Sequence, residues 1–73
     1  MDERTFLDHL AEGSGTDRDA LRVEDSGPRS IRVYFTGKSG PQSREFTVEP
    51  YGDTKDKLGY LFPEVEDVIA NSM

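Results

Sequence analysis

SIRVYFTGKSGPQSREFTVEP, residues 30–50, is the stretch that decides the fold. Apolar and polar side chains alternate over residues 31–36 and again over residues 45–49, which is the two-residue period of a strand that buries one face. The segment between them, GKSGPQS, is rich in Gly, Pro and Ser, the residue types with which chains turn. The pattern predicts a β-hairpin with one buried face.

The register of this hairpin is restricted, because both apolar sets must reach the same face. We expect Phe35 opposite Phe46, which sets Arg32 opposite Glu49 on the outer face as a favourable pair of opposite charges. Pro50 then ends the hairpin, since proline has no N–H to donate to a strand ladder.

The preceding segment, TDRDALRVED at residues 16–25, is open to two interpretations. A Thr followed three residues later by an Asp resembles a capping box and favours a short helix. The alternation over residues 21–25 favours a strand, and SGP at residues 26–28 is a turn leading into the hairpin. We expect the strand, paired so that Glu24 faces Arg32 across the sheet.

Helices are predicted at both ends of the chain. DERTFLDHLAEG at residues 2–13 repeats its apolar positions at helical spacing, and Gly13 supplies a stop. Asp53 can cap a helix from Thr54 to about residue 62, and Pro63 is well placed in the first turn of another helix, EVEDVIANS. The layout is a single α+β domain over residues 1–73: an N-terminal helix, a three-stranded antiparallel meander and two short C-terminal helices packed on one face of the sheet.

Composition excludes several kinds of site. The 73 residues include no Cys and one His, so disulfides and Cys/His zinc sites are excluded, and we expect no metal and no cofactor. We interpret His9 as a solvated surface residue, because catalytic groups come as sets and no partnered nucleophile is identifiable. No apolar run is long enough to span a membrane and no signal sequence opens the chain, so we expect a cytoplasmic protein, in the host cytoplasm if a phage encodes it.

Charge is the most informative part of the composition. Fifteen acidic residues against nine basic ones give a net charge of −6. Residues 1–25 carry −5, residues 26–50 carry +2 and residues 51–73 carry −3, so acid is concentrated at the two helical ends. Ordinary solvation of the helices explains this as well as a shared binding surface does. If the two ends fold together, the acidic surface consists of Asp2, Glu3, Asp8, Glu12, Asp53, Asp56, Glu64, Glu66 and Asp67.

Three of these acids, Glu64, Glu66 and Asp67, cluster near the start of the last predicted helix. Carboxylates in such a cluster can bind a divalent cation. Acids in a first helical turn need only the helix dipole as explanation, however, and nothing resembles a calcium-binding loop. We therefore interpret the cluster as an ordinary helix start.

The leading functional hypothesis follows by elimination. A small acidic chain without a catalytic set is best interpreted as a non-enzymatic protein-interaction module, whose acidic surface steers it towards a protein partner with a basic surface. The most specific version of this hypothesis is an inhibitor encoded by a phage, of the anti-CRISPR or DNA-mimic type, that binds a basic nucleic-acid-handling protein.

Two alternatives stay open. A small nucleic-acid-binding or regulatory β-module would use the outer sheet face, at Arg22, Arg32, Tyr34, Lys38 and Glu49. Direct nucleic-acid binding is less favoured, because the charges of that face nearly balance and it has one central aromatic residue. A structural subunit would instead form a homodimer, through the outer sheet face or an exposed strand edge, which suits a small core.

The hairpin is also similar to the opening hairpin of WYL domains. Those domains pair an aliphatic–aromatic strand with a strand that carries an Arg and ends in Pro, and Arg44, Val48 and Pro50 match that pattern, with GYL following at residues 59–61. The similarity covers about a third of the chain. The chain has no Trp and no counterpart of the second half of a WYL domain, and its net charge opposes the ligand-binding role of that family.

Overall fold

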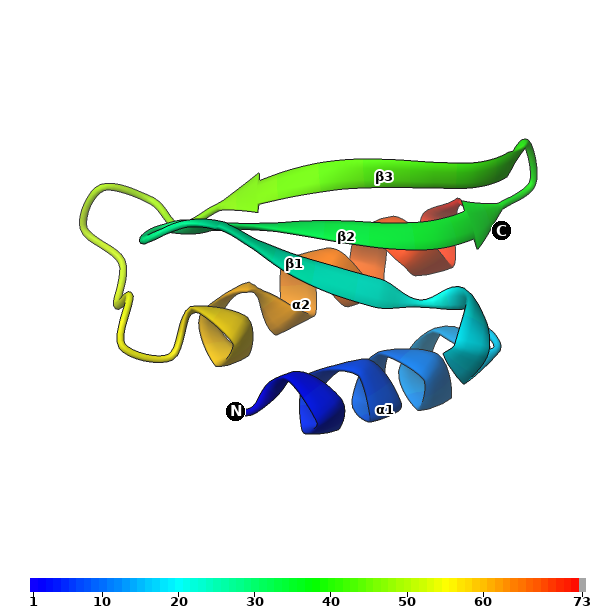
Figure 1. The fold of residues 1–73 in the computed structure, drawn as a ribbon, viewed down its shortest axis with the longest axis horizontal. Coiled ribbons are helices and arrows are strands. Elements are labelled where there is room, and N and C mark those ends of the chain that lie inside the picture. The colour runs from blue at the N-terminus through cyan, green and yellow to red at the C-terminus, as the bar shows by residue number, and fades with distance from the viewer. Residues whose placement is uncertain (73) are drawn as a thin grey trace.

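The computed structural model describes residues 1–72 and has an α+β architecture (Figure 1). Its elements, in chain order, are α1 (Glu3–Ser14), the short 3-10 helix η1 (Arg18–Ala20), β1 (Arg22–Gly27), β2 (Ser30–Gly37), β3 (Gly40–Thr47) and α2 (Lys57–Asn71). The strands form an antiparallel sheet in the order β1-β2-β3, and the helices cover one of its faces. The expected α+β class, N-terminal helix and three-stranded antiparallel sheet are therefore confirmed.

A hydrophobic core lies between the sheet and the two helices. Alternate side chains of the strands point inward and meet the apolar stripes of α1 and α2. Fully burying one aliphatic or aromatic side chain stabilises a fold by about 1.5–3 kcal/mol, so a core of this size suffices for a small domain without disulfides. The core consists of Phe6, Leu7, Leu10, Leu21, Val23, Ile31, Val33, Phe35, Phe46, Val48, Leu61, Val65 and Ile69.

Residues 16–25 contain both of the structures that their sequence suggests. A single tight turn, η1, comes first, and β1 follows it. The expected pairing of β1 with β2 is confirmed: Glu24 lies opposite Arg32, and Val23 lies opposite Val33. The strand interpretation therefore holds for the second half of the segment, because its alternating apolar side chains complete the inner face of the sheet.

The predicted register of the β2–β3 hairpin is wrong. Arg32 lies opposite Glu45 instead of Glu49, and the whole pairing is shifted by four residues. Because four is an even number, Ile31 and Phe46 still face the core together, so the pattern of alternation was compatible with both registers.

The reason for the shift is a tighter turn than the composition suggests. Gly37 pairs with Gly40, so the loop has only two residues, Lys38 and Ser39. Gly40 has a φ of 103°, a left-handed conformation that glycine adopts without strain. Most of the GKSGPQS segment therefore continues the strands, and each added pair gains ladder hydrogen bonds that a longer loop leaves out.

The two predicted C-terminal helices are one continuous helix, α2, which runs through Pro63. Proline removes the hydrogen bond to the carbonyl of Gly59. The apolar stripe of Leu61, Val65 and Ile69 is buried on both sides of the proline, and this packing carries the helix across the missing bond. The cap is also different: Asp56, not Asp53, accepts a hydrogen bond from the first turn, at 3.1 Å from the Gly59 nitrogen.

α1 ends one residue later than predicted, because Gly13 is not its stop. Gly15 ends the helix with a φ of 75°, and its N–H donates to the carbonyl oxygen of Ala11. Gly13 instead lies where the two helices approach each other: a Cβ atom there would lie 1.9 Å from a carboxylate oxygen of Glu66. The glycine therefore leaves room for the Glu66 carboxylate against α1.

Candidate interaction surfaces

The two helices lie side by side and run in the same direction (Figure 1). The rings of Phe6 and Phe62 meet edge to face, with 5.9 Å between their centroids. At the start of both helices, the ammonium group of Met1 lies 2.7 Å from the carboxylate of Asp56. The acidic N-terminal and C-terminal segments of the sequence therefore share one layer, on the same side of the sheet.

Apart from Glu3 in the first turn of α1, four carboxylates of this helical layer have no hydrogen-bond or ion-pair partner among residues 1–72. These helical acids are Glu12, Glu64, Glu66 and Asp67. The two helices themselves contain only two basic residues, Arg4 and Lys57, and the ammonium group of Lys57 is bonded to the β1–β2 turn. The layer thus leaves negative charge uncompensated at its surface.

The helix dipole does not explain the helical acids. Because α2 begins at Lys57, Glu64 lies about two turns into the helix, beyond the reach of the positive N-terminal end. Glu12 lies in the last turn of α1, where a carboxylate meets the negative end of the dipole. The interpretation of the C-terminal cluster as an ordinary helix start is therefore wrong, since it depended on a new helix at Pro63.

Two other predicted acids cap the helices. Asp2 accepts a hydrogen bond from the backbone N–H of Thr5 at 2.7 Å, and this bond lowers the pKa of its carboxyl group. The pKa of Asp56 is lowered first by its bond to the Met1 ammonium group and then by the N–H of its own helix. These two carboxylates serve the fold, so a partner would find them already bonded.

The remaining predicted acids are scattered. Asp8 forms an ion pair with Arg18 of η1 at 2.8 Å, and Asp53 accepts the N–H of Lys55 at 2.9 Å in the loop before α2. Glu3 lines a shallow cavity of about 130 Å³ between β1 and the starts of the two helices. Among the nine predicted acids, Glu3 and the four helical acids are thus in the layer and unpaired within residues 1–72, and Glu3 alone of these five lies in a first helical turn, where the helix dipole favours it.

His9 lies on the side of α1 that faces α2, with its ring edge-on to Phe62 at 6.4 Å between centroids. It is exposed, as expected for a surface histidine. Within residues 1–72, no three His, Cys, Asp or Glu side chains are grouped so that they could hold a metal ion. Neither described helix combines the length and the apolar character that crossing a membrane requires.

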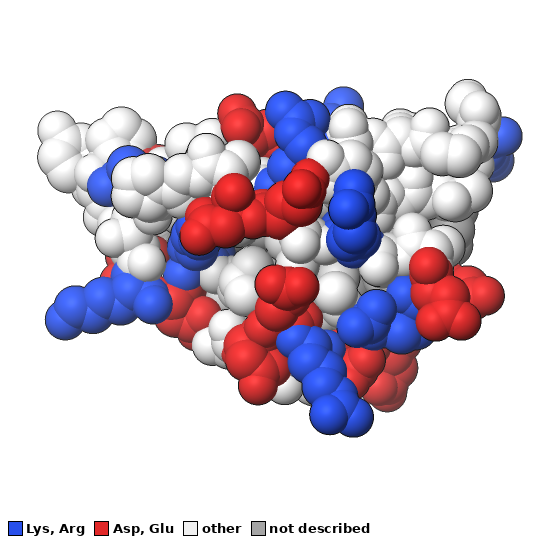
Figure 2. Space-filling model, viewed as in Figure 1, with Lys and Arg blue, Asp and Glu red and all other residues white. Residues whose placement is uncertain are grey.

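The outer face of the sheet brings together three of the five residues predicted for it. The guanidinium group of Arg22 stacks over the ring of Tyr34, 4.2 Å from its centroid, and the Tyr34 hydroxyl donates to the carboxylate of Glu24. That bond raises the pKa of the Tyr34 phenol, because the neutral form is the donor. Arg32 lies opposite Glu24 on one neighbouring strand and opposite Glu45 on the other. In the view of Figure 2, acidic and basic side chains lie side by side over both the sheet and the helices.

The other two residues predicted for the sheet face lie elsewhere. Lys38 is in the β2–β3 turn, where its backbone N–H donates to the carbonyl of Ser72 at 2.9 Å. Glu49 lies beyond the end of β3, and its carbonyl oxygen accepts a hydrogen bond from Arg29. The wrong hairpin register is the reason, since it placed Glu49 on the strand that pairs with β2.

Lys57 is a structural residue that the sequence did not indicate. Its side chain is largely buried, and its ammonium group donates to the carbonyl oxygens of Gly27 at 2.6 Å and Ser30 at 3.1 Å and to the carboxylate of Asp25. This contact lowers the pKa of Asp25. No local signal marks the lysine, because its partners lie in a turn about thirty residues away.

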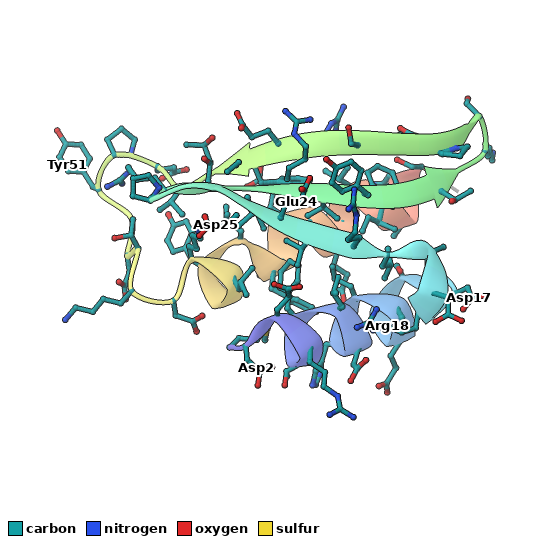
Figure 3. All side chains as sticks on the ribbon, viewed as in Figure 1. Asp2, Asp17, Arg18, Glu24, Asp25 and Tyr51 are labelled. Atoms are coloured by element: carbon teal, nitrogen blue, oxygen red, sulfur yellow. The ribbon has the colours of Figure 1, made fainter. Side chains whose placement is uncertain are left out.

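Tyr51 is the second feature that was missed. Its side chain is fully exposed on the loop between β3 and α2 and points away from the molecule (Figure 3). The sequence carried a signal here, because PYG at residues 50–52 places an aromatic side chain inside a turn.

Comparison with known proteins assigns no family to this arrangement. The chain matches no protein-family model, no curated protein and no solved structure. The similarity of the hairpin to WYL domains therefore carries no family assignment, and function has to be argued from the surfaces themselves.

Proposed function

We propose that this chain is a non-enzymatic protein-interaction module that binds a basic protein surface through its helical layer. The observation that carries the proposal is the union of the two acidic segments in one layer, in which the helical acids have no partner within residues 1–72. Charges that the fold neither pairs nor places at a favourable helix end are free to act on a partner.

The most specific form of the proposal is an inhibitor that occupies the phosphate-binding surface of a nucleic-acid-handling protein, as anti-CRISPR and DNA-mimic proteins do. The carboxylates of two parallel helices offer such a surface several negative charges. A phage-encoded inhibitor acting in the host cytoplasm is the setting in which a small acidic module of this kind is expected.

The nucleic-acid alternative receives less support from the sheet face. Binding of single strands uses exposed aromatic rings on which bases stack, together with free cations along the backbone. Here the ring of Tyr34 is already covered by Arg22, and Arg32 lies between two glutamates. A mobility-shift titration with single-stranded and duplex nucleic acid tests this alternative, which requires binding that weakens on Arg32→Glu.

The test of the main proposal is a matched pair of charge-neutralised variants. In the first, the helical acids are neutralised by Glu12→Gln, Glu64→Gln, Glu66→Gln and Asp67→Asn. In the control, the same charge is removed elsewhere by Asp17→Asn, Asp19→Asn, Glu45→Gln and Glu49→Gln. Asparagine can still cap η1 at residue 17, so the control preserves the local fold.

A partner is captured from host lysate on the immobilised chain, identified by mass spectrometry, purified, and titrated against each variant. We expect the first variant to lose about tenfold or more in affinity and the control about threefold or less, because several contacting charges act together. Wild-type affinity should fall as salt rises, since exposed charges are screened. Affinity unchanged between about 50 mM and about 1 M salt, or equal losses in the two variants, would contradict the proposal.

A further inference from the structure

β3 is an outer strand, and the hydrogen bonds of the hairpin determine which of its backbone groups point away from the sheet. The N–H of Val48 donates to the carbonyl of Arg29 at 2.7 Å, so this pair, and every second pair after it, is bonded within the hairpin. The backbone N–H and C=O groups of the β3 residues between these bonded pairs point away from the sheet. They belong to Pro41, Ser43, Glu45 and Thr47.

Nothing covers this edge within residues 1–72. No backbone hydrogen bond from another segment reaches the outward groups of β3, which runs along the border of the sheet in Figure 1. Side chains from Pro41 to Glu45 are exposed on both faces of the strand, because α2 lies under β2 more than under β3. Pro41 has no N–H to offer, and the charged side chains of Arg44 and Glu45 protect the edge further, but the outward N–H groups of the strand stay unbonded within residues 1–72.

The opposite edge of the sheet is blocked in several ways. β1 carries a bulge between Asp25 and Gly27, and bulges interrupt pairing with a further strand. The ammonium group of Lys57 donates to the carbonyl of Gly27, and α1 contacts the strand. Natural sheets protect their edges with such devices. The contrast singles out β3 as the edge that is left open for pairing.

We propose that a second copy of the chain pairs with this edge, β3 against β3, in an antiparallel dimer centred on Ser43. A two-fold axis through the edge gives antiparallel strands and a self-complementary interface. In this register Gln42 lies opposite Arg44 of the partner, and Pro41 lies opposite the partner's Glu45. No like charges face each other.

The neighbouring registers are disfavoured by charge. A dimer centred on residue 44 sets two arginines directly opposite each other, and one centred on residue 45 does the same with two glutamates. The centre at Ser43 also gives the two outward N–H and C=O groups of the central pair reciprocal partners. A dimer centred on residue 42 would set Ser43 opposite Pro41, which has no N–H to donate, so charge and hydrogen bonding together favour the centre at Ser43.

This inference goes beyond the proposed function, because the edge and the helical acids are different surfaces. A two-fold axis perpendicular to the sheet produces a six-stranded sheet with both helical layers on one face. The dimer would present its acids twice. A variant that no longer dimerises still has its helical acids, and its affinity for the partner can be measured as a monomer. The two proposals can therefore fail independently.

The first experiment uses sedimentation velocity over a wide concentration range. The wild type should show a concentration-dependent dimer. Ser43→Pro removes the central outward N–H without touching the bonds to β2, and it should raise the dissociation constant about tenfold or more. Ser43→Ala keeps that N–H and should dimerise like the wild type. Far-UV circular dichroism checks that both variants are folded.

The second experiment tests the register. Ser43→Glu and Ser43→Lys each place like charges at the centre of the dimer and should weaken it about fivefold, whereas an equal mixture of the two should recover a heterodimer. Thr36→Glu, on the outer face of the central strand, adds the same charge away from the edge and should have no effect. A wild type that stays monomeric, a dimer unchanged by Ser43→Pro, or a mixture no tighter than its components would overturn the proposal.

Discussion

The open face of the sheet and the helical layer treat charge in opposite ways. On the sheet, each central charged group has a neighbour of opposite sign or an aromatic partner: Arg22 stacks on Tyr34, and Arg32 lies between two glutamates. On the helices, Glu3 and the four helical acids have no partner within residues 1–72. The excess negative charge of the chain is thus located on one layer and is not a uniform coating.

The difference shows that the fold tolerates electrostatic repulsion on its helices but not on its sheet. Cross-strand pairs of opposite charge stabilise a sheet, whereas acids spaced three or four residues apart on a helix repel each other by about 0.2–0.5 kcal/mol per pair. Glu64 and Asp67 have such a spacing, as do Asp8 and Glu12. The proposed function would give these helical acids a partner that the fold does not supply, which is the physical basis of the proposal.

The largest effect is expected from separating the two helices. Phe6 is fully buried and contacts Phe62, so Phe6→Ala should destabilise the fold by about 3–5 kcal/mol through lost packing and a cavity. That loss is a large part of the stability of a small domain. Urea unfolding followed by circular dichroism measures it. Tyr51→Ala, which truncates a fully exposed ring, is the control and should stay within about 0.5 kcal/mol of the wild type. Similar midpoints for the two variants would show that α1 is not held by this contact.

A smaller effect is expected where the two layers are joined by polar groups. Lys57→Met leaves the carbonyls of Gly27 and Ser30 without their donor and should cost about 1–3 kcal/mol. Lys55→Met removes an exposed amine and should be close to neutral.

Lys57→Met should also change how the stability of the fold depends on pH. In the wild type the lowered pKa of Asp25 contributes stability above its ordinary pKa, and this contribution is lost as pH falls through the lowered value, below about pH 4. Lys57→Met should remove that part of the acid dependence. NMR titration of the Asp25 carboxyl follows it, and an unchanged Asp25 pKa in the variant would contradict the assigned cause.

The sequence predicted those parts of the fold that depend on local alternation. The strands, the N-terminal helix and the pairing of Glu24 with Arg32 were accessible, because a two-residue period fixes faces and a charge pair can choose between registers. The hairpin register was not accessible, since a shift by four residues preserves every face. The two-residue turn that ends at Gly40 accompanies the observed register, whereas composition had suggested a long loop.

The sequence allowed us to predict which acidic residues belong to the candidate site, but not how they are arranged in space. Counting acids located the two ends of the chain, but packing of Phe6 on Phe62 is what places them in one layer. Pro63 gave the wrong helix boundary, because tertiary burial of Val65 outweighs the local preference of proline for a first turn. That error hid the strongest argument about the C-terminal acids, which is that the helix dipole does not explain them.

The smallest effect, and the sharpest test of the paired sheet face, concerns the Tyr34 phenol. Its bond to Glu24 raises its pKa, so it should ionise above the ordinary tyrosine value of about 10. The stability that accompanies the raised pKa is present below that value and is lost as pH rises through the higher one. Alkaline titration by ultraviolet absorbance should show a late component that is absent from Tyr34→Phe. Glu24→Gln should move it towards the ordinary value, and Glu49→Gln should leave it in place. A Tyr34 that titrates normally in the wild type would mean that its hydroxyl is free. The polar groups of the sheet face would then not all be paired. The hydroxyl and ring of Tyr34 would be available to a nucleic acid, which would favour the nucleic-acid alternative.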